Sequence, residues 1–171
     1  IIRKRLGIKK VGHAGTLDPF AEGVLIILTE SDTKKSEQIM HQEKEYIAEI
    51  KLGFISDTYD KTGKIKKPSY DYTAQNSFMN KTNQELVPEK QKVLKILDKF
   101  TGEIEQIPPM YSAIKIKGKK LYELARKGIE IERKPRKIKI SKIKLLSYNY
   151  PTLKIKIVCS SGTYIRSLAN D

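Results

Sequence analysis

The chain has 171 residues, of which 34 are Lys or Arg and 20 are Asp or Glu, so its formal net charge at pH 7 is +14. A basic excess of this size predicts a polyanionic partner, with nucleic acid ahead of an anionic membrane surface. No apolar segment approaches the roughly 18 residues that a membrane span requires, and no stretch has the layout of a signal peptide.

The length is that of one domain, or a large part of one, and it suffices to bury a core. The single cysteine, Cys159, excludes an intramolecular disulfide and favours a reducing compartment. The two histidines, His13 and His41, have no Cys or His neighbour at a metal-ligand spacing. We therefore expect no metal.

Residues 1–10 are basic and predict the end of an amphipathic helix. Residues 11–19, Val-Gly-His-Ala-Gly-Thr-Leu-Asp-Pro, form a loop in which two glycines allow sharp turns around three polar side chains, His13, Thr16 and Asp18. The apolar run 23–28 that follows predicts a buried strand. A loop of this kind can hold a reactive side chain still, although Asp-Pro is also ordinary turn chemistry and Asp18 could simply cap a turn.

Ser31, Asp32 and Thr33 are N-cap candidates for a surface helix running to about residue 42. Residues 46–53 then alternate apolar and polar side chains, which predicts a half-buried strand. Tyr46 begins this strand, and the pattern alone favours a core aromatic there. We interpret the polar segment 56–63 as a structural turn, because it lacks the ligand spacing of a calcium loop.

Residues 64–87 are poor in apolar side chains and predict a mobile loop, one that RNA could order. Pro88 suits the first turn of a helix, whose apolar stripe is Val93, Ile96, Leu97 and Phe100 and whose end is Gly102. The two prolines in 107–115 argue against a central strand. A short helix with Leu121, Leu124 and Ala125 inward ends at Gly128.

Seven basic residues and no acidic ones occur between residues 133 and 144. Lysines alternate with isoleucines there, which predicts a strand with one basic face over 137–146. Such a face is either solvated or an electrostatic footprint for an RNA backbone. A turn at 149–152 leads to a returning strand at 153–159, and a serine or threonine then caps a last helix that begins near Tyr164 and Arg166. This arginine suits either a phosphate or a structural ion pair.

Taken together, these segments resemble the TruB family of tRNA pseudouridine synthases. The resemblance is carried by Gly-His-Ala-Gly-Thr-Leu-Asp-Pro at 12–19, Ser-Asp-Thr-Tyr-Asp-Lys-Thr-Gly at 56–63, Pro-Pro-Met-Tyr-Ser-Ala-Ile-Lys at 108–115 and Cys-Ser-Ser-Gly-Thr-Tyr-Ile-Arg-Ser-Leu at 159–168. They occur in the family's order and cover nearly the whole chain. Ala14 departs from the family pattern, which has Thr or Ser there. Residues 20–40 and the Pro-Pro-Met-Tyr segment favour the bacterial stand-alone branch over guide-RNA-dependent relatives.

The resemblance implies isomerisation of uridine to pseudouridine in the T-loop of tRNA (position 55), by base flipping, glycosidic cleavage and re-attachment through C5. It implies that Asp18 is the catalytic carboxylate and that Arg166 pairs with it. Tyr46 is expected to stack on the target base, an interaction worth about 1–3 kcal/mol. It also assigns His13, Gly15, Thr16 and Tyr164 to the binding of the substrate. His13 would fill the space that the flipped base leaves, and Tyr164 would line the pocket.

The implied fold is the α/β (α+β) pseudouridine synthase fold, a mixed, mainly antiparallel sheet flanked by helices and loops. We expect residues 1–171 to be the catalytic domain truncated at both ends, without the family's C-terminal RNA-binding module. The expected partner is the T-stem-loop of tRNA, bound by a cytoplasmic monomer that needs no cofactor, no metal and no membrane.

Two other interpretations remain open. The first is a non-catalytic RNA-binding module, because Gly-His-Ala-Gly at 12–15 matches the GXXG loop of KH domains. A lone GXXG is a weak signal, and Leu-Asp-Pro before a strand does not suit a loop between two helices. The second is a basic ribosome-associated protein, which the charge allows and the motifs do not require.

Overall fold

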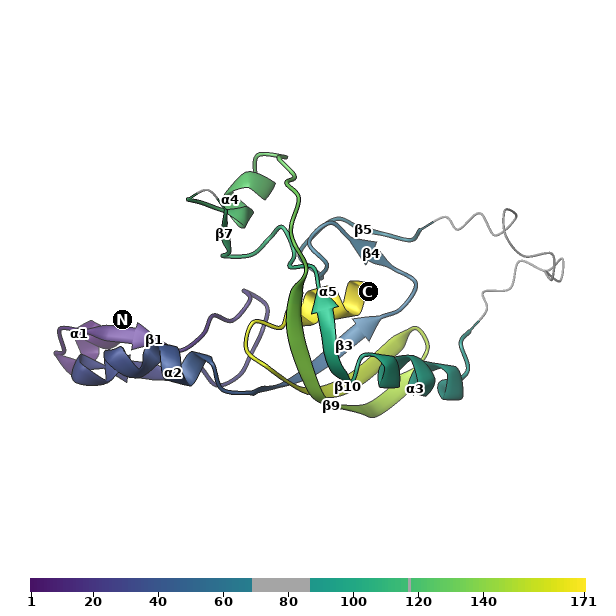
Figure 1. Cartoon of the computed structure of the whole chain (residues 1–171), viewed down its shortest axis with the longest axis horizontal. Helices are drawn as coiled ribbons and strands as arrows, with labels where there is room; N and C mark the ends of the chain where they lie inside the picture. Colours follow the sequence, from purple (N-terminus) through teal and green to yellow (C-terminus); the bar gives the residue numbers. More distant parts are fainter. Residues whose placement is uncertain (69–86, 117) are drawn as a thin grey trace, which may run out of the picture. The chain divides into compact units, whose positions relative to one another are not determined.

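A computed structural model describes residues 1–68, 87–116 and 118–171. The chain divides into two compact units, Ile1–Lys44 and Glu45–Asp171. Figure 1 shows the helices and strands of both units. None of the helices in the described ranges combines the length and the apolar character that a membrane crossing requires.

The first unit is built from short elements around a two-stranded antiparallel sheet. The predicted N-terminal helix is present and ends where Gly7 adopts a left-handed conformation, φ 64°, as C-terminal glycines commonly do. The elements are α1 (Ile2–Leu6), β1 (Val11–His13), β2 (Ile27–Thr29), the 3₁₀ helix η1 (Glu30–Lys35) and α2 (Ser36–Met40).

The prediction of a buried strand over 23–28 was wrong. Strand β2 begins only at Ile27, and the side chains of Val24, Leu25 and Ile26 are 91%, 40% and 42% exposed. Its partner β1 has three residues, and the register runs only from Val11↔Thr29 to His13↔Ile27. An apolar run without a partner strand has no ladder to join, so only Leu28 is buried.

The predicted helix after residue 31 is present in two parts, η1 followed by α2, and it ends at Met40. Its N-cap position is Thr29, without a side-chain capping bond. The three predicted cap residues therefore lie inside η1. The Thr33 hydroxyl instead donates to the Glu30 carbonyl oxygen at 2.7 Å.

The second unit contains a four-stranded sheet in the order β3-β10-β9-β6. Strand β9 is antiparallel to both of its neighbours, β10 and β6. The predicted strands over 46–53, 137–146 and 153–159 are confirmed, and β9 extends further than expected at both ends. The strands are β3 (Lys44–Lys51), β6 (Gly102–Gln106), β9 (Arg136–Asn149) and β10 (Thr152–Cys159).

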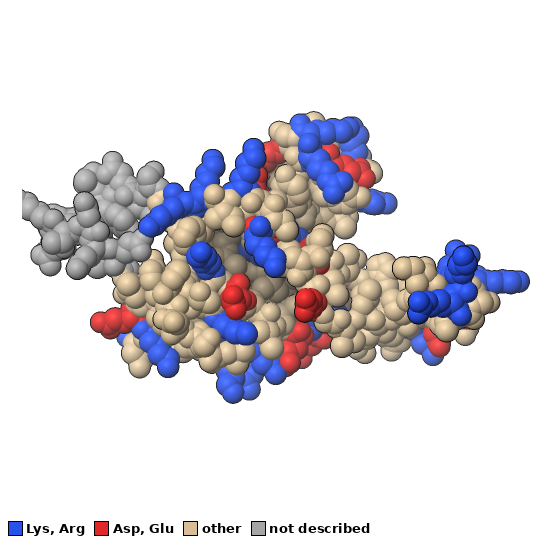
Figure 2. All heavy atoms as spheres, turned by 180° about the vertical axis from the view of Figure 1, so that it is seen from behind, with Lys and Arg blue, Asp and Glu red and all other residues tan. Residues whose placement is uncertain are grey.

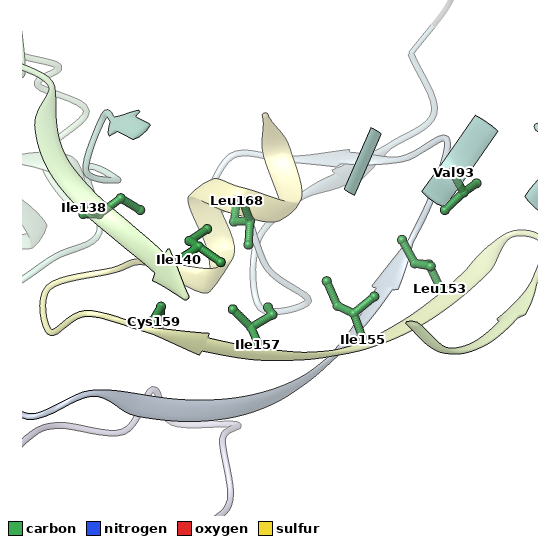
Figure 3. Close-up of a cluster of buried hydrophobic side chains, with 8 residues drawn as sticks. All are labelled: Val93, Ile138, Ile140, Leu153, Ile155, Ile157, Cys159 and Leu168. Carbon is green, nitrogen blue, oxygen red and sulfur yellow. The ribbon is translucent and has the colours of Figure 1, made fainter. Parts of the chain in front are cut away.

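The core of this unit lies on one face of the sheet. Alternate residues of β9 and β10 point into it, because successive side chains of a strand face opposite sides. Helices α3 (Lys90–Lys99) and α5 (Ile165–Asn170) contribute to the same cluster through Val93 and Leu168 (Figure 3). The opposite face carries the exposed, mostly charged positions of the strands, as expected of an antiparallel sheet with one solvated side.

The predicted stripe on α3 is only partly inward: Val93 is buried, Leu97 and Phe100 pack on the core, and Ile96 is 44% exposed. Pro88 precedes the N-cap Glu89 rather than occupying the first turn, and its carbonyl oxygen accepts the Tyr148 hydroxyl at 2.6 Å. Gly102, with φ 108°, begins β6 immediately after the helix has ended.

Two small hairpins and a short helix are the other elements in the described part of this unit. Helix α4 (Leu121–Ala125) is the predicted one, with Leu121 buried. The hairpins are β4 (Ile55–Ser56) with β5 (Ile65–Lys66), and β7 (Lys115–Ile116) with β8 (Lys119–Lys120). The loop predicted over 64–87 thus begins with a strand, and its part at 69–86 lies outside the described residues.

Candidate active site

Arg166 is the second residue of α5, and its guanidinium is held by three groups of the second unit. Nη1 donates to the Thr58 carbonyl oxygen at 3.2 Å and lies 3.4 Å from Asp60 Oδ2, while Nη2 donates to the Tyr111 carbonyl oxygen at 3.0 Å. The two side chains of the ion pair are 11% and 7% exposed. The arginine is therefore fixed in a nearly dry environment, where its charge acts strongly.

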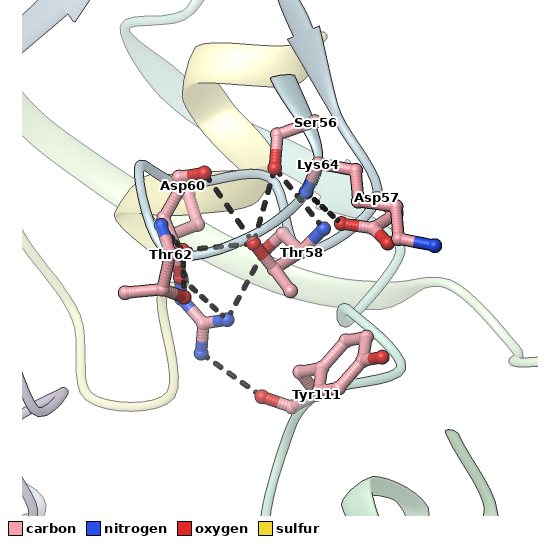
Figure 4. A network of polar contacts seen from close by, with 8 residues as sticks. Ser56, Asp57, Thr58, Asp60, Thr62, Lys64 and Tyr111 are labelled. Atoms are coloured by element: carbon pink, nitrogen blue, oxygen red, sulfur yellow. Dashed lines mark hydrogen bonds and ion pairs between the residues drawn. The ribbon is translucent and has the colours of Figure 1, made fainter. Parts of the chain in front are cut away.

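Asp60 is the acidic centre of the turn 56–63 (Figure 4). Its Oδ1 accepts the Thr58 hydroxyl at 2.8 Å, the Thr62 N–H at 2.8 Å and the Thr62 hydroxyl at 2.5 Å. Burial alone would raise the pKa of this carboxyl. The hydrogen bonds from Thr62 and Thr58, together with the Arg166 charge, outweigh burial and hold the pKa below its usual value.

Glycine at position 63 leaves room for three polar side chains of the turn. A Cβ built there would lie 2.1 Å from Asp57 Oδ1, 2.4 Å from Thr58 Oγ1 and 2.5 Å from Ser56 Oγ. Asp57 Oδ1 also accepts the Lys64 N–H at 2.8 Å. The prediction of a structural turn at 56–63 is thus confirmed. What the sequence reasoning missed is that this turn holds Arg166.

The helix that carries Arg166 lacks the predicted side-chain cap. Its N-cap residue is Tyr164, with extended φ and ψ of −99° and 107° and no side-chain capping bond. The Thr163 hydroxyl donates backward to the Ser160 carbonyl oxygen at 2.9 Å, away from the helix. The cap prediction was wrong because the helix begins one residue later than a cap at Thr163 requires. Tyr164, the predicted pocket residue, is partly buried.

The motif loop lies in the first unit, between β1 and β2. His13 Nδ1 forms a short hydrogen bond to the Gly15 carbonyl oxygen, so Nδ1 carries the proton, since a carbonyl can only accept. Gly15 has φ 138°, which only glycine adopts readily. Ala14 is 6% exposed and its N–H donates to the Ile26 carbonyl oxygen at 3.0 Å.

Thr16 is exposed and Asp18 is partly buried in the same loop. The Asp18 carbonyl oxygen accepts the Ala21 N–H at 2.9 Å, which closes a turn after Pro19. Asp18 lies in the first unit and Arg166 in the second. Their pairing therefore stays a prediction, and the structure adds Asp60 as an ion-pair partner of Arg166.

Tyr46 is the third residue of β3 and is partly buried on the face that packs against the core. This position is the one expected of a core aromatic, and it leaves part of the side chain accessible. Stacking of Tyr46 on a base stays a prediction.

The basic strand β9 faces acidic residues on one side. The register places Lys137 opposite Glu105 and Lys139 opposite Glu103 of β6, an arrangement that stabilises an antiparallel pair. In the β7–β8 hairpin, by contrast, Lys115 lies opposite Lys120. Lysine and arginine side chains crowd over α4 and this hairpin in Figure 2. Lysines thus face each other across the β7–β8 hairpin, whereas Lys137 and Lys139 of β9 face glutamates of β6.

An open cavity of about 220 Å³ lies beside the turn, lined by Asp60, Tyr59 and Phe54 among others. None of the predicted site residues lines it. Within the described parts of the chain, no three His, Cys, Asp or Glu side chains are grouped so that they could hold a metal ion.

The arrangement also bears on the KH interpretation. Gly12 lies within strand β1, and the chain after Gly15 leads into strand β2. A GXXG clamp needs helices on both sides, so the 12–15 segment is not one.

The model of the TruB family pseudouridylate synthase (N terminal domain) matches residues 3–165. The chain is 49% identical over 171 residues to tRNA pseudouridine synthase B of Protochlamydia amoebophila, covering 99% of this chain and 59% of that protein. It is 51% identical over 171 residues to tRNA pseudouridine synthase B of Clostridium tetani, covering 100% of this chain and 54% of that protein. The chain thus spans somewhat more than half the length of these two relatives.

Among solved structures, the chain matches one in the crystal structure of a Cbf5-Nop10-Gar1 complex, with a TM-score of 0.65 and 27% identity over 98% of this chain and 36% of that one. A second match, in the structure of an H/ACA RNP bound to a substrate RNA containing 2'-deoxyuridine, has a TM-score of 0.60 and 24% identity over 98% of this chain and 34% of that one. These similarities confirm the predicted fold. With the family model matching nearly the whole chain, the chain belongs to the TruB family of pseudouridylate synthases.

Proposed function

We propose that this chain is the catalytic portion of an enzyme that converts uridine to pseudouridine in the T-loop of tRNA (position 55). The observation that carries the proposal is the family match over residues 3–165, which includes Asp18, Tyr46 and Tyr164 and ends one residue before Arg166. The names of the relatives, which are 43–51% identical, support tRNA as the RNA class. The proposal takes the protein as a cytoplasmic monomer that recognises the T-stem-loop.

In the proposed reaction, Asp18 supplies the carboxylate that the isomerisation needs. Asp18 lies in a loop that is restrained by the hydrogen bond from His13 Nδ1 to the Gly15 carbonyl oxygen and by the positive φ of Gly15. These restraints favour a defined position for the aspartate. Attack on the sugar or the base requires the ionised form, which a neighbouring guanidinium favours. Arg166 is the proposed neighbour. Its contacts with Thr58, Asp60 and Tyr111 hold the guanidinium in one orientation.

The uridine must leave the base stack before it can react. Tyr46 is proposed to stack on the flipped base, and Tyr164 to line the pocket beside it. His13, on the motif loop, is proposed to fill the vacated space, with Gly15 and Thr16 shaping the loop against the RNA. The reaction cleaves the N-glycosidic bond and rejoins the same base through C5, so no co-reactant is consumed and no cofactor is required.

The test uses the full-length gene product and a tRNA transcript carrying 5-tritiated uridine, because forming the C5–C1′ bond releases the tritium. The wild-type protein should release tritium, and Asp18→Asn should abolish release while RNA affinity changes less than about threefold. Asp32→Asn is the matched control: this aspartate lies in the same unit, 53% exposed and paired with Lys35, and its loss should leave the rate unchanged.

Two results would contradict the proposal. A wild-type protein that binds tRNA without releasing tritium would be an RNA-binding module. Normal turnover by Asp18→Asn would remove Asp18 from the chemistry while leaving the activity in place. An isolated T-stem-loop hairpin as substrate, with the product position mapped by carbodiimide-induced reverse-transcription stops, tests the site preference.

A further inference from the structure

Gln106 is a buried amide at a position where the strand pattern expects an apolar side chain. It is the last residue of β6, on the same face as Gly102 and Ile104, and it is 2% exposed. A buried carboxamide must find partners for its oxygen and its NH₂ group, since leaving either one unpaired costs about 1–3 kcal/mol. Its partners therefore indicate why a glutamine is there.

Both partners belong to Tyr164. The Tyr164 N–H donates to Gln106 Oε1 at 2.8 Å, and Gln106 Nε2 donates to the Tyr164 carbonyl oxygen at 3.0 Å. The side-chain amide thus forms hydrogen bonds with both backbone polar groups of one residue, 58 positions away in the chain. We call this pair of hydrogen bonds the Gln106 grip. A glutamine side chain has one acceptor and one donor in the geometry that this grip needs.

Tyr164 is the point at which the strand–helix connection becomes α5. It is the N-cap of the helix, and its carbonyl oxygen also accepts the Leu168 N–H at 3.1 Å. Arg166 follows two residues later. The position of the Tyr164 backbone therefore sets the position of the Tyr164 Cα, from which the ring extends. It also sets the direction of the first turn of α5, which bears the Arg166 side chain.

A second hydrogen bond connects the segment after β6 with α5, so Gln106 is not needed merely to hold these two segments together. The Ser167 hydroxyl, 1% exposed, donates to the Ile107 carbonyl oxygen at 2.9 Å. Arg166 Nη2 likewise bonds the Tyr111 carbonyl oxygen. Helix α5 is thus attached to the 107–111 segment without Gln106, and what Gln106 adds is a specific hold on the Tyr164 backbone.

We propose that Gln106 is a positioning residue for pseudouridine formation, which sets the Tyr164 backbone and, through it, the Tyr164 ring and the Arg166 guanidinium. The inference rests on the proposed function. A misplacement of about 1 Å at a reacting group can reduce a rate about 100-fold. Loss of the grip should therefore lower kcat much more than it weakens RNA binding.

The experiment compares Gln106→Met with Ser167→Ala in the full-length protein. Methionine keeps the length of the side chain and removes both hydrogen bonds to Tyr164. Alanine at 167 removes the other buried tie between the same segments and does not touch the Tyr164 backbone. We expect Gln106→Met to lower kcat at least tenfold with KM changed less than about threefold. Ser167→Ala should lower Tm by a similar amount and kcat less than threefold.

A second variant keeps the test informative if Gln106→Met folds poorly. In Gln106→Glu the ionised carboxylate has no donor for the Tyr164 carbonyl oxygen, whereas the protonated acid has one donor and one acceptor, as glutamine does. The ratio of its kcat to the wild-type kcat should rise as pH falls from 8.5 to 6, because the acid form restores the grip. Taking the ratio at each pH removes the response of groups that both proteins share.

Hydrogen exchange at the Tyr164 amide gives a readout that does not need activity. This amide should exchange at least tenfold faster in Gln106→Met than in the wild type, and unchanged protection would overturn the grip itself. Faster exchange with an unchanged kcat, or equal losses of kcat in Gln106→Met and Ser167→Ala, would overturn the positioning role.

Tritium release by the wild-type protein decides the proposed function separately. A wild type that releases no tritium would overturn the positioning role of Gln106, and the exchange measurement would still test its two hydrogen bonds to Tyr164.

Discussion

The carboxylate of Asp60 and the guanidinium of Arg166 form a nearly buried ion pair, Nη1 to Oδ2 at 3.4 Å, between a tight turn and the first turn of the last helix. The same Nη1 atom also donates to the carbonyl oxygen of Thr58, in the same turn. The turn 56–63 therefore orients the Arg166 guanidinium through two contacts. In return, the arginine stabilises the turn, so a change in either one should affect the other.

We expect Asp60→Asn to destabilise the protein, and to do so mainly at neutral pH. Removing one partner of a buried pair typically costs about 3–5 kcal/mol, and the lower end is expected here because Arg166 keeps two carbonyl acceptors. Asparagine retains an oxygen for the Thr58 and Thr62 donors and places its NH₂ group where Oδ2 faces Arg166, so the change removes the ion pair and keeps the threonine hydrogen bonds. Urea unfolding at pH 7 measures the loss.

The pH dependence of that loss follows from the sign of the pKa shift. The folded-state pKa of Asp60 is lowered below its usual 3.8, so the stabilisation is present above the unfolded-state pKa and is lost as pH falls through the folded-state value. The stability difference between wild type and Asp60→Asn should thus shrink below about pH 4. A constant difference from pH 6 to pH 2.5 would contradict a charge-based role.

Gly63→Ala should disrupt the same turn by a different route. The added Cβ would meet three side-chain oxygens at 2.1–2.5 Å, so these side chains have to move and their hydrogen bonds in the turn are disturbed. Overpacking of this kind costs about 1–3 kcal/mol, and Asp60 should shift with the turn. Gly12→Ala is the matched control, since a Cβ there meets only Thr33 at an ordinary 3.6 Å and Gly12 has no positive φ. Equal melting temperatures for the two variants would rule out steric exclusion at residue 63.

Features set by residues close together in the sequence were predictable, whereas features set by contacts between distant parts of the chain were not. The long strands β3, β9 and β10 were predictable because alternation over seven or more residues reports one buried face. The strand predicted over 23–28 failed because an apolar run carries no information about its partner, and β1 offers only three residues. Pairing decides a strand, and pairing is not local.

The site shows the same division. Motif resemblance drew attention to Arg166 and to the turn 56–63 as separate features, while their contact joins residues 108 positions apart. Gln106 was not singled out at all. A signal for it did exist: the alternation through Ile104 places residue 106 on the core face, and a glutamine there must find buried partners.

Replacing Tyr46 separates packing from stacking. Tyr46→Phe keeps the ring against the core and should leave RNA affinity within about threefold, whereas Tyr46→Ala removes the ring. The alanine variant should lose about 2–4 kcal/mol of stability and, if the ring stacks on the target base, about 1–3 kcal/mol of binding to substrate RNA. Fluorescence titration with tRNA under conditions where both variants are fully folded measures the second quantity. Equal affinities of the two variants would leave Tyr46 as a core aromatic only.

The charge pattern makes a prediction about which lysines meet RNA phosphates. Lys137 and Lys139 face Glu105 and Glu103 across the β6–β9 pair, so their charge is already balanced locally. At the β7–β8 hairpin, Lys115 faces Lys120, which concentrates positive potential that a phosphate relieves. We expect the double variant Lys115→Gln, Lys120→Gln to reduce the slope of log K against log salt for tRNA binding by about 1–2. The double variant Lys137→Gln, Lys139→Gln is the control and should leave the slope within about 0.3. The reverse ranking would place the RNA-contacting charge on β9, and equal reductions would mean that the cross-strand glutamates do not screen it.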